Sequence, residues 1–119
     1  VSGQLSKAAD GSLITGRLGD GVALETGQHA ARLCALNILA QVKAALGSLD
    51  RIAQIMRLTG FVACTPEFGE HPQVVNGASG LLGEALGANG RHTRTSVGVA
   101  SLPLNAAVEI DAILKIKDR

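Results

Sequence analysis

Apolar side chains recur every three or four positions between about residues 23 and 46. Polar residues such as Gln28 and Lys43 fall on the opposite side of this stripe. This period is typical of an amphipathic helix that lies on one face of a sheet. Gly47 follows the last apolar position and is expected to end the helix.

A second helical stripe covers residues 72–86, with Pro72 in its first turn, where proline is tolerated. Gly77, Gly80 and Gly83 lie inside it. Each glycine lowers intrinsic helix stability by about 1 kcal/mol relative to alanine. We therefore expect close packing against a neighbour to hold this helix.

Alternating apolar and polar positions predict strands around these helices. Residues 51–64 form one long run, in which Met56 and Leu58 share the apolar face. Residues 93–101 and 106–116 are two β-branched runs joined by a turn-forming segment with Pro103, and we expect them to pair as an antiparallel hairpin. Residues 1–5 are interpreted as the end of an edge strand whose beginning is missing upstream.

The order of these elements predicts an α+β sandwich in which two helices cover one face of a mixed sheet of four or more strands. The length of 119 residues fits a single domain over residues 1–119. The other sheet face needs a cover, and the core of small aliphatic side chains gains from a partner. Both features favour a homo-oligomer.

Composition narrows the function classes. Hydrophobic residues make up 46% of the chain and charged residues 18%, which excludes disorder. A net charge of +1 and 2% aromatic residues offer neither a basic face nor a stacking platform, so nucleic-acid binding is disfavoured. No apolar run is long enough for a membrane span and no signal peptide is recognisable, so we expect a soluble, cytoplasmic protein.

Cysteine and histidine give little indication of a site. Cys34 and Cys64 have no metal-ligand spacing and are interpreted as buried free thiols. His29, His71 and His92 are each interpreted as surface or packing residues. No metal and no cofactor is implied.

Arg94 and Glu109 are the charged residues that two apolar strands do not need. A guanidinium stays charged and grips a carboxylate through two parallel hydrogen bonds, and Ser96 and Gly98 on the same strand face leave room for a ligand. A partly desolvated Glu109 suits a general acid or base. Alternatively, Arg94 forms a solvated or intersubunit ion pair and Glu109 points outward beside Asp111. Whether Arg94 and Glu109 share a face depends on a one-residue register, unless they converge across a subunit boundary.

The C-terminal third carries a resemblance to a known family. Arg94-Thr-Ser-Val-Gly-Val-Ala-Ser-Leu-Pro103 followed by Val108-Glu-Ile-Asp111 resembles the signature of the YjgF/YER057c/UK114 family. This family is also called the reactive intermediate deaminase (Rid) family and was once described as endoribonuclease L-PSP. Weaker similarity at residues 2–4, 58–62 and 75–76 extends the resemblance over nearly the whole chain, closest to a less characterised branch.

The resemblance implies a chorismate-mutase-like fold, assembled as a homotrimer whose sheets form a central barrel with clefts between subunits. Arg94 matches the residue that binds the substrate carboxylate, and Glu109 the one that positions or activates water. Asn76 matches a pocket residue, Ser96 stands where many members have cysteine, and Gly3 matches a glycine of the pocket wall. These five residues are the implied site.

Three functions are compatible with the resemblance. The first is hydrolytic deamination of reactive 2-imino or enamino acids, released by pyridoxal phosphate enzymes, to 2-keto acids and ammonia. The alternative is a non-catalytic trimer that binds a small carboxylate and regulates or protects a partner. The remote alternative is endoribonuclease activity, against which charge and composition argue.

Overall fold

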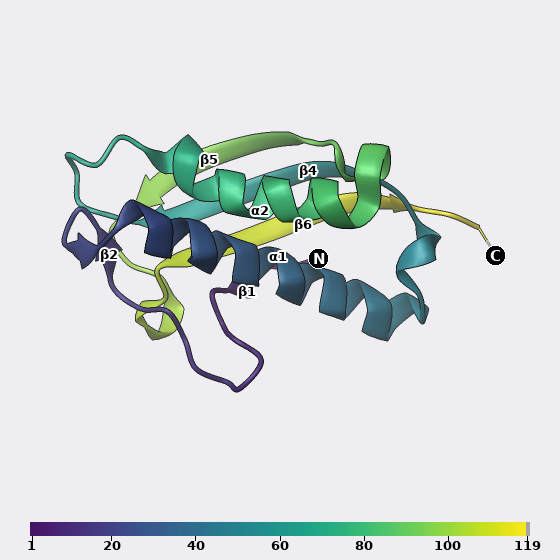
Figure 1. Ribbon diagram of the computed structural model, residues 1–119, viewed down its shortest axis with the longest axis horizontal. Helices are drawn as coiled ribbons and strands as arrows, with labels where there is room; N and C mark the ends of the chain where they lie inside the picture. Colours follow the sequence, from purple (N-terminus) through teal and green to yellow (C-terminus); the bar gives the residue numbers. More distant parts are fainter. Residues whose placement is uncertain (119) are drawn as a thin grey trace.

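The computed structural model describes residues 1–118, in which two helices pack on one face of a four-stranded sheet (Figure 1). The helices are α1 (Leu24–Leu46) and α2 (His71–Leu86). In spatial order, the strands are β1 (Gln4–Leu5), β6 (Val108–Ile116), β4 (Ile52–Ala63) and β5 (Thr93–Val99). The short strands β2 (Arg17–Leu18) and β3 (Gly21–Val22) pair separately. The predicted α+β class is confirmed.

The sheet is mixed, and the expected hairpin of residues 93–116 is wrong. β5 runs parallel to β4, whereas β6 pairs antiparallel with β4 on its other side, so β4 separates β5 from β6. A helix between two strands of one sheet brings the second back parallel to the first, and α2 makes this crossover from β4 to β5. The segment after Pro103 passes the end of β4, where the N–H of Ala63, the last residue of β4, donates to the Ala107 carbonyl.

The two predicted helices are confirmed, and glycines set their end and their spacing. Gly47 caps α1 in the left-handed conformation, with φ of 84°. Gly77 of α2 lies so close to Gln28 of α1 that a Cβ there would overlap the Gln28 carbonyl oxygen. The close packing expected for the glycine-rich helix is therefore present at Gly77.

The long strand is confirmed as β4, with one change of face. Leu58 and Val62 are fully buried under the helices, as expected. Met56 is instead 48% exposed, because the pairing with β6 shifts between Ile55 and Arg57. One extra residue in a strand breaks the alternation of faces.

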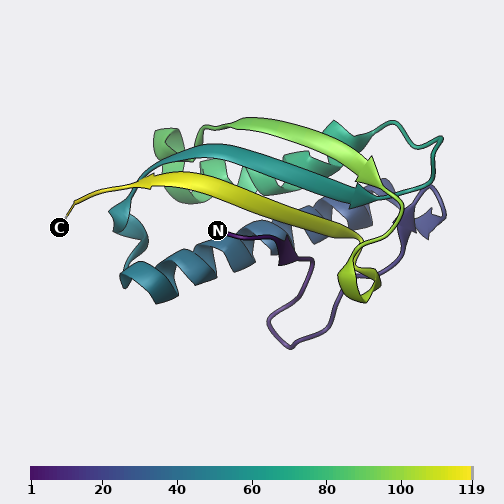
Figure 2. The same cartoon turned by 180° about the vertical axis from the view of Figure 1, so that it is seen from behind.

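No helix of the described residues covers the other face of the sheet, as the reverse view shows (Figure 2). Phe61 and Glu109 lie opposite each other on this open face. Two apolar side chains of the sheet, Val97 and Ile113, are 39% and 63% exposed. Neither helix within residues 1–118 has the length and hydropathy that crossing a membrane requires.

Candidate functional site

The helix side of β5 presents Arg94, Ser96 and Gly98 in a row. Arg94 lies opposite Leu58 in the register with β4, and Ser96 lies opposite Gly60. Paired residues of neighbouring strands point to the same face, and Leu58 is buried under the helices. The predicted common face of these three β5 residues is therefore present.

The Arg94 guanidinium is fixed by α2. Its NH1 group donates to Ser79 Oγ at 3.0 Å, and its NH2 group donates to the Pro72 carbonyl at 3.1 Å. The other N–H groups of the fork have no such bond among the described residues, so they are available to a carboxylate. Arg94 also lines a surface cavity of about 390 Å³, which we call the Arg94 hollow, together with Ser79, Gly83, Gly90, Arg91 and His92.

A short chain of hydrogen bonds orients the Ser79 hydroxyl. His92 Nδ1 lies 2.6 Å from the Gly90 carbonyl, which can only accept a hydrogen bond. Nδ1 therefore carries the proton, and in the neutral ring Nε2 accepts from the Ser79 hydroxyl at 2.8 Å. Ser79 then has a lone pair free for Arg94. His92, which was expected to be a surface or packing residue, thus supports the candidate anchor through Ser79.

Ser96 Oγ is buried and has no hydrogen-bond partner in the described structure. Buried hydroxyl groups are normally hydrogen-bonded, because an unpaired one loses its bonds to water. The hydroxyl lies in the same row as Arg94 but is covered by protein atoms, so a molecule bound at Arg94 would pair with it only if the covering side chains moved aside.

Glu109 and Gly3 form a second group, on the other side of the sheet. Glu109 lies on β6 opposite Phe61 of β4 and opposite Leu5 of β1. Gly3 precedes β1, and a Cβ at Gly3 would overlap the Glu109 carboxylate. The bare backbone of Gly3 therefore makes room for the half-buried Glu109 side chain.

The structure does not bring all five sequence-predicted residues together. Arg94 and Glu109 lie on opposite faces of the sheet, and β4 lies between their strands. Asn76 is on α2 but lines a separate hollow of about 340 Å³ beside Gln28 and His29 of α1. One chain thus holds the Arg94 and Ser96 group, the Glu109 and Gly3 group, and Asn76 as three separate parts.

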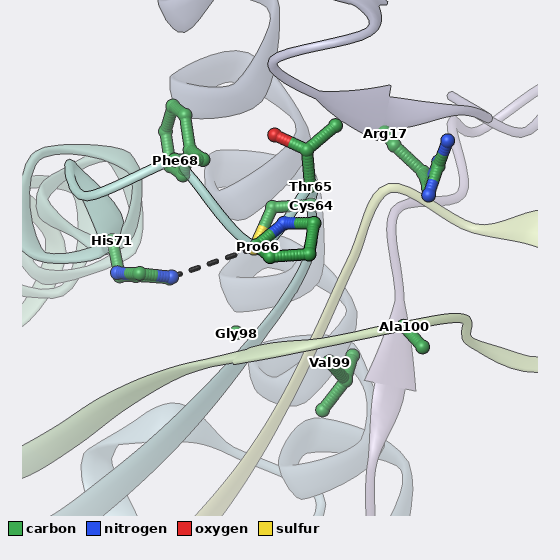
Figure 3. Close-up of a pocket in the computed structure, with 9 residues that line it drawn as sticks. All are labelled: Arg17, Cys64, Thr65, Pro66, Phe68, His71, Gly98, Val99 and Ala100. Atoms are coloured by element: carbon green, nitrogen blue, oxygen red, sulfur yellow. Dashed lines mark hydrogen bonds between the residues drawn. The ribbon is translucent and has the colours of Figure 1, made fainter.

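A further cavity of about 360 Å³ lies at the end of the β5 row (Figure 3). We call it the thiol cavity. Its lining residues come from β2, the end of β4, the start of α2 and the end of β5: Arg17, Cys64, Thr65, Pro66, Phe68, His71, Gly98, Val99 and Ala100.

A thiol and an imidazole meet in this cavity. Cys64 Sγ lies 3.4 Å from His71 Nε2 (Figure 3). Burial raises the pKa of the Cys64 thiol, while the backbone at Val99 and the positive charge of Arg17 act in the opposite direction. Both cysteines are free and buried, as predicted, but the interpretation of His71 as a surface or packing residue missed this contact.

Sequence signals for these contacts were weak. The Cys64–His71 pair depends on a loop that returns the chain to the end of β4, and Ser79 and His92 meet because α2 packs beside β5. Gly98, in the row with Arg94 and Ser96, was the one visible signal of extra space. No three His, Cys, Asp or Glu side chains of residues 1–118 are grouped as metal ligands would be, so we assign no residue to a metal.

Comparison with known proteins agrees with this fold. Residues 1–114 match the family model described as "YjgF/chorismate mutase-like, putative endoribonuclease". Protein TCP17 of Trypanosoma cruzi is 47% identical over 119 residues, which cover 99% of this chain and 74% of that protein.

Two solved structures are also close. The protein Atu1372 from Agrobacterium tumefaciens, of unknown function, is 55% identical with a TM-score of 0.96, over 98% of this chain and 76% of that one. A putative endoribonuclease from Shewanella oneidensis is 40% identical with a TM-score of 0.88, over 92% of this chain and 73% of that one. This chain belongs to the YjgF/chorismate mutase-like family, as its C-terminal signature predicted.

Proposed function

We propose that this protein hydrolyses reactive 2-imino or enamino acids to 2-keto acids and ammonia, in clefts between the subunits of a homotrimer. The observation that carries the proposal is the Arg94 guanidinium, which Ser79 and Pro72 hold while its other N–H groups have no hydrogen bond within residues 1–118. Such a fixed fork suits a planar carboxylate. Beside it in the row, the buried Ser96 hydroxyl has no partner in the described chain.

The chemistry needs orientation more than a reactive side chain. Arg94 would hold the substrate carboxylate while Glu109 accepts a hydrogen bond from a water molecule. The water oxygen bonds to the imine carbon, the nitrogen gains protons, and the carbon–nitrogen bond breaks to release ammonia and leave the keto group. Glu109 would take the proton that water loses and return it to the leaving nitrogen.

A subunit boundary is the natural place for this site. Arg94 and Glu109 face opposite sides of the sheet in one chain, so we infer that a cleft that holds both takes them from two copies. The uncovered sheet face carries exposed apolar side chains, Val97 and Ile113, that a neighbouring subunit would bury. We propose that three such faces form the central barrel, and that the enzyme acts in the cytoplasm, where pyridoxal phosphate enzymes release such intermediates.

The test is ammonia release from 2-iminopropionate generated in the assay by a second enzyme. Wild-type protein should accelerate release above the buffer rate, and Arg94→Ala should abolish the acceleration. Arg91→Ala is the matched control, because exposed Arg91 lines the same hollow without the bonds to α2. A wild-type rate equal to buffer, or full activity of Arg94→Ala, would contradict the proposal.

Glu109→Gln separates turnover from binding. The amide keeps the shape of the carboxylate but cannot take a proton from water, so ammonia release should fall while calorimetric affinity for a 2-keto acid is retained. If neither the wild type nor any variant turns over an imine but the 2-keto acid still binds through Arg94, the protein is a carboxylate-binding module. RNA cleavage by the pure protein would favour the endoribonuclease description of the family.

A further inference from the structure

The Cys64–His71 contact is set by the fold rather than by neighbouring positions in sequence. Cys64 directly follows β4, and His71 is the first residue of α2. The Phe68 ring meets the imidazole edge-on, with centroids 5.4 Å apart and planes at 81°. This contact restricts the ring that places Nε2 at 3.4 Å from Cys64 Sγ.

Gly98 leaves the space that the pair occupies. A Cβ at position 98 would lie 2.6 Å from Cys64 Sγ and 2.6 Å from His71 Nε2, closer than atoms of these types can approach. Gly98 is exposed, so the space is next to solvent. Only a glycine at position 98, the third residue of the β5 row, leaves room for the thiol and the imidazole in these positions.

A cation belongs to the same cavity. A bridge between Leu18 and Cys64 places β2 beside the end of β4, and Arg17 lines the cavity from there (Figure 3). Arg17 pairs with Asp20 at 2.8 Å, but the two side chains are 43% and 63% exposed. Exposed ion pairs are weak, so an incoming anion can share the guanidinium.

Cys34 shows what an inert thiol looks like in the same chain. It is fully buried in the core, where its thiol donates to the Val108 carbonyl at 3.4 Å. It lines none of the cavities described above. Cys64 differs by having a base within reach, an open cavity and a cation in the cavity wall.

We propose that the thiol cavity is a second reactive site, in which Cys64 adds covalently to a small α,β-unsaturated carboxylate. His71 Nε2 takes the thiol proton, the sulfur bonds to the β-carbon, and the carbon–carbon double bond becomes single. The proton then passes from His71 to the α-carbon, so the S–H adds across the double bond without any co-reactant. Arg17 binds the carboxylate. This chemistry goes beyond imine hydrolysis, which forms no bond to the protein.

The experiment uses acrylate as the anionic probe and acrylamide as its neutral counterpart. Intact full-length protein is incubated with each, and the modified cysteine is identified by peptide mass spectrometry. Cys64 should be labelled while Cys34, the internal control, is not. The acrylate-to-acrylamide rate ratio at Cys64 should exceed that of glutathione under the same conditions.

Three variants test the roles. His71→Gln should slow labelling of Cys64 by both probes about a hundred-fold, because the general base is gone. Arg17→Gln should slow acrylate about two- to five-fold and leave acrylamide unchanged. Gly98→Ala should block both probes by filling the space, and it keeps the proposal testable if His71→Gln fails to fold. Gly80→Ala is its control, since a Cβ at Gly80 meets nothing within 4 Å.

The proposal is overturned if Cys64 reacts no faster than Cys34 in the folded protein, or if folded His71→Gln or Gly98→Ala reacts at the wild-type rate. A loss in Arg17→Gln that is equal for both probes would also overturn it, because no carboxylate is then recognised. The assay contains no imine, so its result is independent of deaminase activity.

Discussion

At the scale of single residues, the Ser96 side chain lowers the stability of the fold, because its hydroxyl is buried without a hydrogen bond within residues 1–118. Its buried hydroxyl has no partner among the described residues, and burial of such a group costs about 1–3 kcal/mol. Ser96→Ala should therefore raise the free energy of unfolding, by about 1 kcal/mol, while it weakens binding of a 2-keto acid.

Urea denaturation at fixed protein concentration measures the first effect and calorimetry the second. Exposed Ser101 is the matched control, and Ser101→Ala should change stability by less than about 0.5 kcal/mol. Lower stability in Ser96→Ala would show that the hydroxyl is satisfied by a partner such as an ordered water.

Gly3 tests whether the position of Glu109 matters. A Cβ at Gly3 would overlap the Glu109 carboxylate, so Gly3→Ala must move it. Displacement of a catalytic group by about 1 Å can cost about a hundred-fold in rate. We expect kcat for ammonia release to fall towards that of Glu109→Gln, with affinity for a 2-keto acid retained. Ser2→Ala, at the neighbouring exposed position, should keep wild-type kcat; unchanged kcat in Gly3→Ala would remove Glu109 from the mechanism.

At the scale of elements, the sequence predicts what periodicity governs. The stripe ending at Gly47 predicts α1 almost to the residue, and the alternation after Arg51 predicts β4. Periodicity does not predict which strands pair. The turn-forming segment at Pro103 suggested that β5 and β6 form a hairpin, whereas the α2 crossover places β5 beside β4. The same error left open which faces Arg94 and Glu109 occupy. Met56 lies off its expected face because the pairing of β4 with β6 shifts between Ile55 and Arg57. Such a shift leaves no signature in an apolar run of the sequence, so it could not be predicted.

Two glycines of α2 should respond oppositely to substitution by alanine, one losing and one gaining stability. A Cβ at Gly77 would overlap the Gln28 carbonyl oxygen of α1, whereas a Cβ at Gly80 meets nothing within 4 Å. Gly77→Ala should lower the free energy of unfolding by about 1–3 kcal/mol through overpacking. Gly80→Ala should raise it by up to about 1 kcal/mol through helix propensity. Thermal and urea unfolding of both variants measure this, and equal effects would contradict the close contact of the helices.

At the scale of the whole molecule, one chain holds the candidate residues apart. Arg94 and Ser96 occupy the helix side of the edge strand β5, and Glu109 occupies the open face of β6. If the two residues meet across a subunit boundary, the register within one chain does not matter. The observed faces give that alternative a physical basis, because the backbone of β4 lies between the two groups.

This separation makes a sharp prediction for mixed oligomers. Arg94→Ala chains keep Glu109, and Glu109→Gln chains keep Arg94, so each is inactive alone. If each cleft takes Arg94 from one subunit and Glu109 from the next, every mixed trimer has a single intact cleft. Random mixing in equal amounts should then restore about a quarter of the wild-type ammonia release.

The mixed oligomers are made by co-expression with two different tags, or by unfolding and refolding the variants together. Gly3→Ala mixed with Glu109→Gln is the matched control, because both changes damage the same half of the site and no cleft is rescued. Suppose that the Arg94→Ala and Glu109→Gln mixture releases ammonia no faster than the sum of its separate components. That result would mean that both residues act within one chain, or that they do not share a site. Recovery in that mixture together with none in the control would assign Arg94 and Glu109 to different subunits of one cleft.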